Sequence, residues 1–377
     1  MDFALNEEQE MLRTSVRDFL TTECPKSVVR ELEASELGYS PEMWKRMAEL
    51  GWMGLIIPEE YGGAGYTLLE LALLFEEFGR AAMPSPMFNT MVLGTLPILE
   101  GGTEEQKQEL LPQIASGELI LTMALVEPEM DYELSSIATR AIPEDGGFAI
   151  TGTKLFVPYA HTANRVLVVT RTGESVADDQ GITVFIVDGK APGVSLTPLI
   201  TIAADKQFEL QFDRVSASSS DILGGLDSGS PLIKAMLQKA TAIQCAQMVG
   251  GAQQELEITA EYTKTRVQFE RPIGTFQAVQ HRLADMLIDV NGARWTTYQA
   301  VWRLSEGLPA AREVAIAKAF TSSACQRVAA SAQQLHGGIG VDVDYDLHFY
   351  YRRAKALELN LGATPYHIKA LESELGF

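Results

Sequence analysis

Arg266-Val267-Gln268-Phe269 is followed along the chain by Phe276-Gln277 and by Gln334-Leu335-His336-Gly337-Gly338-Ile339-Gly340. These stretches lie in the last third of the sequence, at separations that two packed helices and their joining turns can span. Around them, apolar residues recur with a helical period over residues 232–265, 277–306, 309–334 and 346–362. The pattern predicts a C-terminal helical domain, arranged as a four-helix bundle, over residues 226–377.

The rest of the chain divides into a second helical part and a β-rich part. Helical periodicity marks residues 1–120, where Asn6 with Gln9 three residues later is a capping signal and Pro41 after Ser40 marks a helix start. Residues 121–225 contain β-rich runs separated by Gly, Asp and Pro turns, at 148–150, 166–169, 182–187 and 208–212. The predicted fold class is α+β, with an N-terminal α-helical domain, a middle antiparallel β-barrel or sandwich, and the C-terminal bundle.

The composition disfavours several classes of protein. The 377 residues, 46% of them hydrophobic, suffice for two or three domains with buried cores. The longest apolar runs are far shorter than the roughly 20 residues of a membrane span, so none is expected. The first residues lack the basic flank and apolar core of a secretory signal, which predicts a cytoplasmic location. Cys24, Cys245 and Cys325 fall outside any CxxC spacing, which predicts reduced thiols and no metal site.

The charge of the chain bears on its ligands. A formal net charge of -20 at pH 7 repels phosphate backbones and argues against nucleic-acid binding. A small anionic ligand remains compatible with this charge, because a few local arginines or a helix N-terminus can hold a diphosphate.

The order helix, sheet, helix is similar to that of the acyl-CoA dehydrogenase family over essentially the whole chain. Local motifs resemble the same family: Pro58-Glu59-Glu60-Tyr61-Gly62-Gly63, Val126-Glu127-Pro128 and Arg352-Arg353-Ala354-Lys355. The resemblance implies an FAD-dependent oxidoreductase that acts on an acyl-CoA thioester. It also implies an electron-transfer flavoprotein as acceptor, and a homo- or hetero-tetramer with a homologous subunit.

The resemblance further implies where the cofactor binds. Residues near the ends of the C-terminal helices are expected to reach across a subunit interface to the diphosphate and adenine of FAD: Arg266, Phe269, Gln277, Gln334, Gly337 and Gly338. Phe156 and Val157 match the strand that lies beside the flavin ring in the family.

In the family, a carboxylate removes the α-proton of the acyl group while the β-hydrogen leaves as a hydride to flavin N5. A carboxylate suits this role because desolvation beside an apolar acyl chain raises its pKa toward that of the α-carbon. Its fixed position also removes the entropic cost of bringing base and substrate together. The residue that matches the usual base position is Leu361, and the alternative position on an earlier helix is Ala240. Neither side chain accepts a proton.

The middle domain departs from the family pattern as well. Glu129-Met130-Asp131-Tyr132-Glu133 stands where the family has Gly-x-Gly-Ser-Asp, and its larger side chains hinder close approach of the backbone to a flavin. Phe156-Val157-Pro158 stands where the family has Trp-Ile-Thr, and proline offers neither a hydroxyl nor a backbone N–H. The C-terminal face that serves a neighbour's FAD keeps its motifs.

This asymmetry resembles the heteromeric acyl-CoA dehydrogenases of actinobacterial steroid side-chain breakdown, in which only one of two homologous chains brings the base. We therefore expect α,β-dehydrogenation of an acyl-CoA thioester by a subunit that works with a base-bearing partner. One alternative is a homomeric enzyme with a relocated base, for which Glu358 is the candidate, followed by Tyr366 and His367. Another is a non-catalytic scaffold of the same fold that binds acyl-CoA or FAD.

Overall fold

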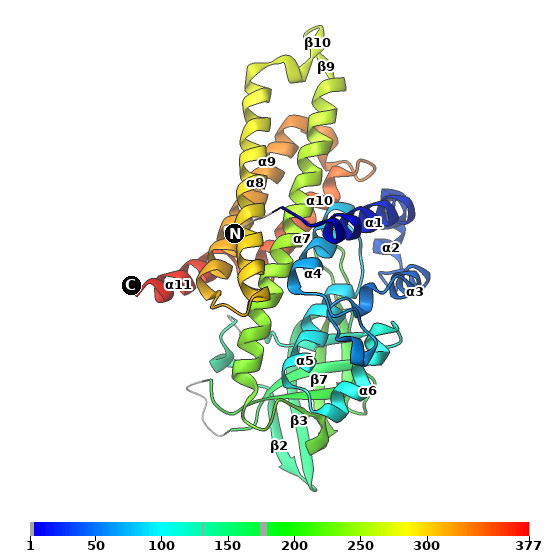
Figure 1. Cartoon of the computed structure of the whole chain (residues 1–377), viewed down its shortest axis with the longest axis vertical. Helices are drawn as coiled ribbons and strands as arrows, with labels where there is room; N and C mark the ends of the chain where they lie inside the picture. Colours follow the sequence, from blue (N-terminus) through cyan, green and yellow to red (C-terminus); the bar gives the residue numbers. More distant parts are fainter. Residues whose placement is uncertain (1–3, 130–131, 174–178, 377) are drawn as a thin grey trace. The chain divides into compact units, whose positions relative to one another are not determined.

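The computed structural model of the chain describes residues 4–129, 132–173 and 179–376 (Figure 1). The α-helices are α1 (Glu7–Glu23), α2 (Lys26–Ala34), α3 (Pro41–Glu49), α4 (Leu68–Ala81), α5 (Leu96–Gly101), α6 (Glu104–Ala115), α7 (Gly229–Thr265), α8 (Gln277–Ser305), α9 (Ala311–His336), α10 (Leu347–Leu359) and α11 (Thr364–Leu375). The strands are β1 (Leu121–Ala124), β2 (Arg140–Glu144), β3 (Gly147–Pro158), β4 (Arg165–Arg171), β5 (Ile182–Asp188), β6 (Val194–Leu199), β7 (Gln207–Ala217), β8 (Ile222–Leu223), β9 (Val267–Gln268) and β10 (Arg271–Pro272).

The chain forms two compact units, which are described one at a time. The helical unit comprises Met1–Arg30, Thr67–Met83 and Thr241–Phe377, and the sheet unit comprises Glu31–Tyr66 and Pro84–Ala240. These units gather segments that are far apart in the sequence, whereas the predicted boundaries at residues 120 and 225 follow chain order and stay predictions. No helix in the described part of the chain has the length and apolar character of a membrane span.

Capping residues start the helices where the sequence predicts. Asn6 caps α1: its Oδ1 accepts a hydrogen bond from Gln9 N at 2.8 Å, and Gln9 Oε1 accepts one from Asn6 N at 3.0 Å. Ser40 caps α3, since its Oγ accepts a hydrogen bond from Met43 N at 3.2 Å. Each cap satisfies backbone N–H groups that the first helical turn leaves unpaired. Both predicted helix starts are therefore confirmed.

Helices α7, α8, α9 and α10 confirm the helical pattern of the C-terminal region, and the β9–β10 hairpin joins α7 to α8 (Figure 1). Two glycines let α4 pack closely against α7. A Cβ atom at Gly79 would lie 1.8 Å from Gln247 O, and one at Gly250 would lie 1.8 Å from Glu76 O. Only glycine permits this approach of two backbones. The crossing ties α4, far away in the sequence, to the C-terminal helices of the helical unit.

The helical unit contains a small, mostly apolar cavity of about 30 Å³, lined by residues of α4, α7, α9 and α10 that include Phe78, Glu255, Cys325, Tyr350 and Arg353. Glu255 is 1% exposed, and its Oε1 has no hydrogen-bond partner within the described residues. Burial raises the pKa of Glu255 well above its ordinary value of 4.5. The carboxyl group therefore keeps its proton to a higher pH than an exposed glutamate does, since burial disfavours the charged form.

The sheet unit is built on an eight-stranded sheet with the order β6-β7-β3-β2-β4-β5-β8, in which β1 also pairs with β4. Four of its strands, β3, β4, β5 and β7, contain the predicted β-rich runs. The prediction of an antiparallel sheet is wrong at β4, which is parallel to β1, with Leu121 opposite Arg165, and also parallel to β2, with Arg140 opposite Arg171. The β2–β3 hairpin lies between β1 and β4 in the chain. This long connection lets the chain return in the same direction, as a parallel pair requires.

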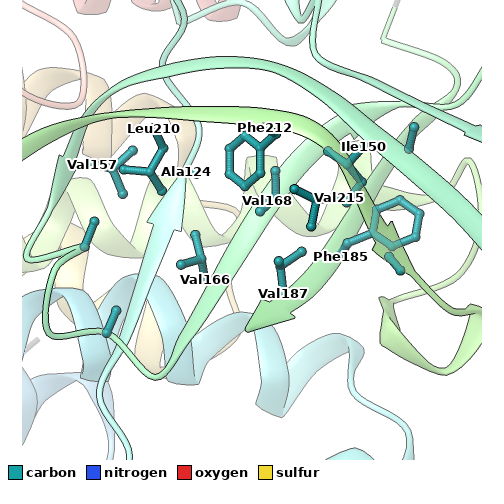
Figure 2. Packing of buried hydrophobic residues seen from close by; sticks show 14 of the residues in the cluster. Ala124, Ile150, Val157, Val166, Val168, Phe185, Val187, Leu210, Phe212 and Val215 are labelled. Carbon is teal, nitrogen blue, oxygen red and sulfur yellow. The ribbon is translucent and has the colours of Figure 1, made fainter. Parts of the chain in front are cut away.

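Side chains from facing strands fill the core of the sheet unit (Figure 2). They point toward one another from β1, β3, β4, β5 and β7 and include Ala124, Ile150, Val157, Val166, Val168, Phe185, Val187, Leu210, Phe212 and Val215. On β7, Phe208, Leu210 and Phe212 are buried at every second position, as the strand period requires. A register shift against β3 then moves the next inward residue to Val215, as a β-bulge does.

The buried carboxyl group of Glu255 makes a testable contribution to the pH dependence of stability. An acid whose pKa is higher in the folded state binds more protons there, so the free energy of unfolding falls as pH rises above the unfolded value. The slope for one such group is about 1.4 kcal/mol per pH unit. In Glu255→Gln this slope disappears. Thermal unfolding between about pH 5 and about pH 8 should therefore show the variant gaining stability relative to wild type.

Glu306→Gln, at an exposed position of the same unit, is the matched control and should keep the pH dependence of the wild type. Parallel pH–stability curves for wild type and Glu255→Gln would contradict a raised pKa of Glu255 in the folded state.

Candidate functional site

The loop between α10 and α11 holds Leu361, the residue at the predicted base position. Helix α10 ends at Leu359, earlier than the predicted end at residue 362. Leu361 has φ 57° and Gly362 has φ 91°, so both are left-handed. That conformation is ordinary for glycine and costly for leucine. A leucine in this conformation implies that surrounding groups hold the loop in place.

Side chains from two other helices bind the polar backbone groups of this loop. Lys318 Nζ, on α9, donates to Leu357 O at 2.5 Å and to Asn360 O at 2.9 Å. Asn360 Oδ1 accepts a hydrogen bond from Leu361 N at 3.1 Å. His367 Nε2, on α11, lies 2.9 Å from Leu361 O. A carbonyl oxygen only accepts, so the proton of the His367 ring is on Nε2.

Lys318 is a residue that the sequence analysis missed. Its side chain is fully buried, and Nζ makes a further contact with Gln244 Oε1 at 2.7 Å. Burial lowers the pKa of Lys318 to about 8. The available signal was a lysine in an otherwise apolar part of its helix, Ala315-Ile316-Ala317-Lys318-Ala319-Phe320.

Ala240, the second predicted base position, is a fully buried residue of α7. Gln244 follows one helical turn later on the same face. Its side chain is 1% exposed, and its Nε2 has no hydrogen-bond partner among the described residues. Gln244 offers a neutral amide, which cannot act as a base.

Glu358, the candidate for a relocated base, lies in the last turn of α10. Its side chain is buried, and its Oε2 accepts a hydrogen bond from Lys355 Nζ at 3.0 Å. Glu358 does not share a helical face with Leu361, because α10 ends at Leu359 and the backbone then turns left-handed. The carboxylate of Glu358 is thus paired with a lysine on its own helix.

The predicted cofactor residues at the end of α7 lie on an exposed hairpin. Gln268 pairs with Arg271, which leaves Phe269 and Glu270 as the two turn residues. Both have positive φ, 53° and 65°, as a type I′ turn requires, although such turns favour Asn and Gly. The Phe269 side chain is 86% exposed. The turn thus presents an aromatic ring to solvent, in a strained backbone that the usual turn residues would relieve.

Arg266 and Gln277 flank this hairpin and are both exposed, with Gln277 at the first position of α8. Phe269 packs edge-on against Phe276, with ring centroids 6.1 Å apart. Arg266, Phe269 and Gln277 therefore lie on or beside one hairpin at the end of α7, and their contact with a cofactor stays a prediction.

The end of α9 carries the second set of predicted cofactor residues. Gln334, Gly337 and Gly338 are exposed, and a Cβ atom at either glycine would meet no atom within 4 Å. His336 beside them is buried: its ring stacks on Tyr262 of α7 with centroids 4.3 Å apart, and Nδ1 donates to Ala332 O at 2.8 Å. This contact holds the end of α9 against the last turns of α7, so His336 has a structural role.

These residues have the chemistry that FAD requires. An exposed guanidinium suits a diphosphate, exposed amides suit polar ring edges, and open space over Gly337 and Gly338 lets a ligand approach the backbone. Among the described residues, no group of His, Cys, Asp or Glu side chains could hold a metal ion.

In the sheet unit, Phe156 and Val157 face opposite ways. Phe156 is 55% exposed, whereas Val157 is fully buried in the sheet core (Figure 2). Phe156 has φ 52° and sits where the β3–β7 register shifts, between Lys154 and Val157. Of the two side chains predicted to contact the cofactor, only that of Phe156 is available to a ligand. The bulge turns this aromatic ring outward.

A buried ion pair fixes the segment Val126-Glu127-Pro128 against β3. Lys154 Nζ donates to Glu127 Oε1 at 2.6 Å, and Glu127 also accepts hydrogen bonds from Ala138 N at 2.6 Å and Thr139 N at 3.0 Å. Burial alone would raise the pKa of Glu127, but these donors outweigh it and leave that pKa below its ordinary value. Of the stretch predicted to hinder the flavin, Met130 and Asp131 lie outside the described residues.

Comparison with known proteins agrees with this arrangement over the whole chain. Models of the acyl-CoA dehydrogenase N-terminal, middle and C-terminal domains match residues 6–118, 122–215 and 227–375. The acyl-CoA dehydrogenase FadE27 of Mycobacterium tuberculosis is 33% identical over 383 residues, which cover 100% of this chain and 99% of that protein.

Solved structures agree as well. The ChsE4-ChsE5 complex from Mycobacterium tuberculosis contains a chain that is 32% identical, with a TM-score of 0.91 and coverage of 100% of this chain and 99% of that one. Butyryl-CoA dehydrogenase from Megasphaera elsdenii is 27% identical, with a TM-score of 0.93 and full coverage of both chains, 100% each. The chain therefore belongs to the acyl-CoA dehydrogenase family, whose members are flavin-dependent oxidoreductases.

Proposed function

We propose that this chain is one subunit of an FAD-dependent enzyme that removes hydrogen from the α- and β-carbons of an acyl-CoA thioester, and that a homologous partner chain supplies the catalytic carboxylate. The observation that carries the proposal is the loop at Leu361. Its backbone is held by side chains of other helices, while the residue at the base position offers only an alkyl group. Neither Ala240 nor the paired Glu358 replaces the missing base.

The exposed end of the helical unit would hold the cofactor. Arg266 is suited to the diphosphate of FAD, and Gln277, Gln334 and the Gly337–Gly338 backbone are suited to its polar edges. Phe269 offers a ring face for stacking. FAD, when bound, supplies the acceptor for the hydride that leaves the β-carbon.

The residues of this chain would then bind and orient the acyl-CoA ester, and the partner chain would remove its α-proton. Leu361 would cover the α-carbon region with an apolar surface and exclude water from it. The C–H bond at the α-carbon breaks with transfer of its proton to the partner's carboxylate, and the electron pair of that bond forms the new double bond. Placement of the ester between two chains supplies the proximity that a shared site requires.

Similarity to a chain of the ChsE4-ChsE5 complex supports pairing with a homologous subunit, in a hetero-tetramer or a related assembly. The proposal includes an electron-transfer flavoprotein as the electron acceptor, as the family resemblance implies, and a cytoplasmic location. A scaffold that only binds acyl-CoA would share the fold, and the experiments below separate it from an enzyme subunit.

Leu361→Glu places a carboxylate at the base position and tests whether a general base is the group that the site lacks. We expect the FAD-loaded variant, without any partner, to reduce its flavin with an acyl-CoA ester under anaerobic conditions. A positioned general base contributes roughly 10²-fold or more, so bleaching should be at least that much faster than in wild type. The measurement is flavin absorbance against time.

Leu361→Gln is the matched control, because it has nearly the same shape as Leu361→Glu without a base. Equal bleaching rates in the two variants would contradict the assignment of Leu361 to the base position.

Arg266→Ala tests the cofactor end of the helical unit. Loss of one charge-assisted hydrogen bond to the diphosphate should weaken FAD binding by roughly 10- to 100-fold. The purified complex should therefore show a lower ratio of flavin absorbance to protein. Arg13→Ala, which removes an arginine from α1, is the control and should keep its FAD. Unchanged FAD content in Arg266→Ala would remove this residue from the site.

A further inference from the structure

The ammonium group of Lys318 is matched by oxygen acceptors from separate parts of the helical unit. It donates to Gln244 Oε1 on α7, to Leu357 O on α10 and to Asn360 O in the loop that follows. An ammonium group has three N–H donors, and burying one costs several kcal/mol unless those donors are satisfied. Lys318 is 0% exposed and finds such partners at the end of α10. The hydrogen bonds of its ammonium group therefore determine where the Lys318 side chain lies.

Lys318 caps α10 in place of the usual backbone arrangement. The last carbonyl groups of a helix lack partners within the helix, and a left-handed glycine commonly closes the end with backbone hydrogen bonds. Here the chain leaves the helix at Asn360, with ψ 143°, and the first left-handed residue is Leu361. A cation at this end is also favoured by the negative end of the helix dipole.

His367 holds the loop on the far side of Leu361. Its ring is 6% exposed, and Nε2–H donates to Leu361 O at 2.9 Å. Burial lowers the pKa of His367 to about 4, so the ring is neutral near pH 7. A Cβ atom at Gly362 would lie 2.5 Å from Tyr366 Cδ1 and 3.0 Å from His367 Nε2. The first turn of α11 therefore packs directly on the loop, and only glycine fits there.

We propose that Lys318 and His367 are positioning residues that fix Leu361 as a rigid apolar wall of the acyl site. This inference rests on the proposed function, in which Leu361 stands where the family has its base. A fixed leucine selects acyl groups that are apolar next to the thioester. A hydroxyl group in that place would lose its water without gaining a hydrogen-bond partner.

The test compares His367→Leu with His367→Gln in the FAD-loaded complex of this chain with a homologous, glutamate-bearing partner. Leucine cannot donate a hydrogen bond to Leu361 O, whereas the glutamine amide can. His367→Leu should raise the KM for a saturated acyl-CoA ester roughly fivefold, the factor expected from one lost hydrogen bond, with a smaller change in kcat. His367→Gln should restore the KM.

Hydrogen exchange of the backbone supplies a second readout that needs no substrate. In His367→Leu, the segment of residues 359–363 should exchange faster, while the distant helix α1 keeps its wild-type rate. Lys318→Met should speed exchange of the same segment. If Lys318→Met does not fold, the His367 pair decides the question alone.

Unchanged exchange and unchanged KM in His367→Leu would overturn the inference, and so would a defect that His367→Gln fails to restore. If the complex turns over no acyl-CoA ester, the proposed function fails and the apolar wall fails with it. The exchange rates still test whether Lys318 and His367 position the loop, because that measurement needs no substrate. Failure of the proposed function can therefore be distinguished from failure of the positioning role.

Discussion

The buried ammonium group of Lys318 is the constraint on which the proposed site depends. A charge removed from water must find oxygen partners where it lies, and Lys318 finds them on α7, at the end of α10 and in the loop before Leu361. These contacts join two helices to the loop that matters for the chemistry. The left-handed backbone of Leu361 becomes tolerable because its neighbours are held on both sides.

The sheet unit uses the same device on a different loop. Lys154 and Glu127 form a buried pair that ties the segment around Glu127 to β3, close to the bulge that turns Phe156 outward. A buried lysine thus fixes an irregular stretch of backbone in each unit. Lys318 does so next to Leu361, and Lys154 does so next to Phe156, and both neighbours have a proposed ligand contact. Loops of this kind carry function because a rigid scaffold positions them.

Local signals in the sequence predicted local structure. The cap at Asn6, the start at Ser40 and the β-rich runs of β3, β4, β5 and β7 were all found, because each depends on neighbouring residues. The parallel pairing of β1 with β4 was missed, since it depends on contacts across a long connection. The partners of Lys318 and the inward direction of Val157 were missed for the same reason. The turn at Phe269 and Glu270 lacks the Asn-Gly signal that would have marked it.

We propose that this chain carries the framework of an acyl-CoA dehydrogenase without its own base. The most direct measurement is an anaerobic titration with acyl-CoA esters, followed by flavin absorbance, of the FAD-loaded chain alone and of its complex with a homologous chain that has the glutamate. We expect the flavin to be bleached only in the complex. Bleaching of the chain alone at the rate of the complex would instead require a base within this chain.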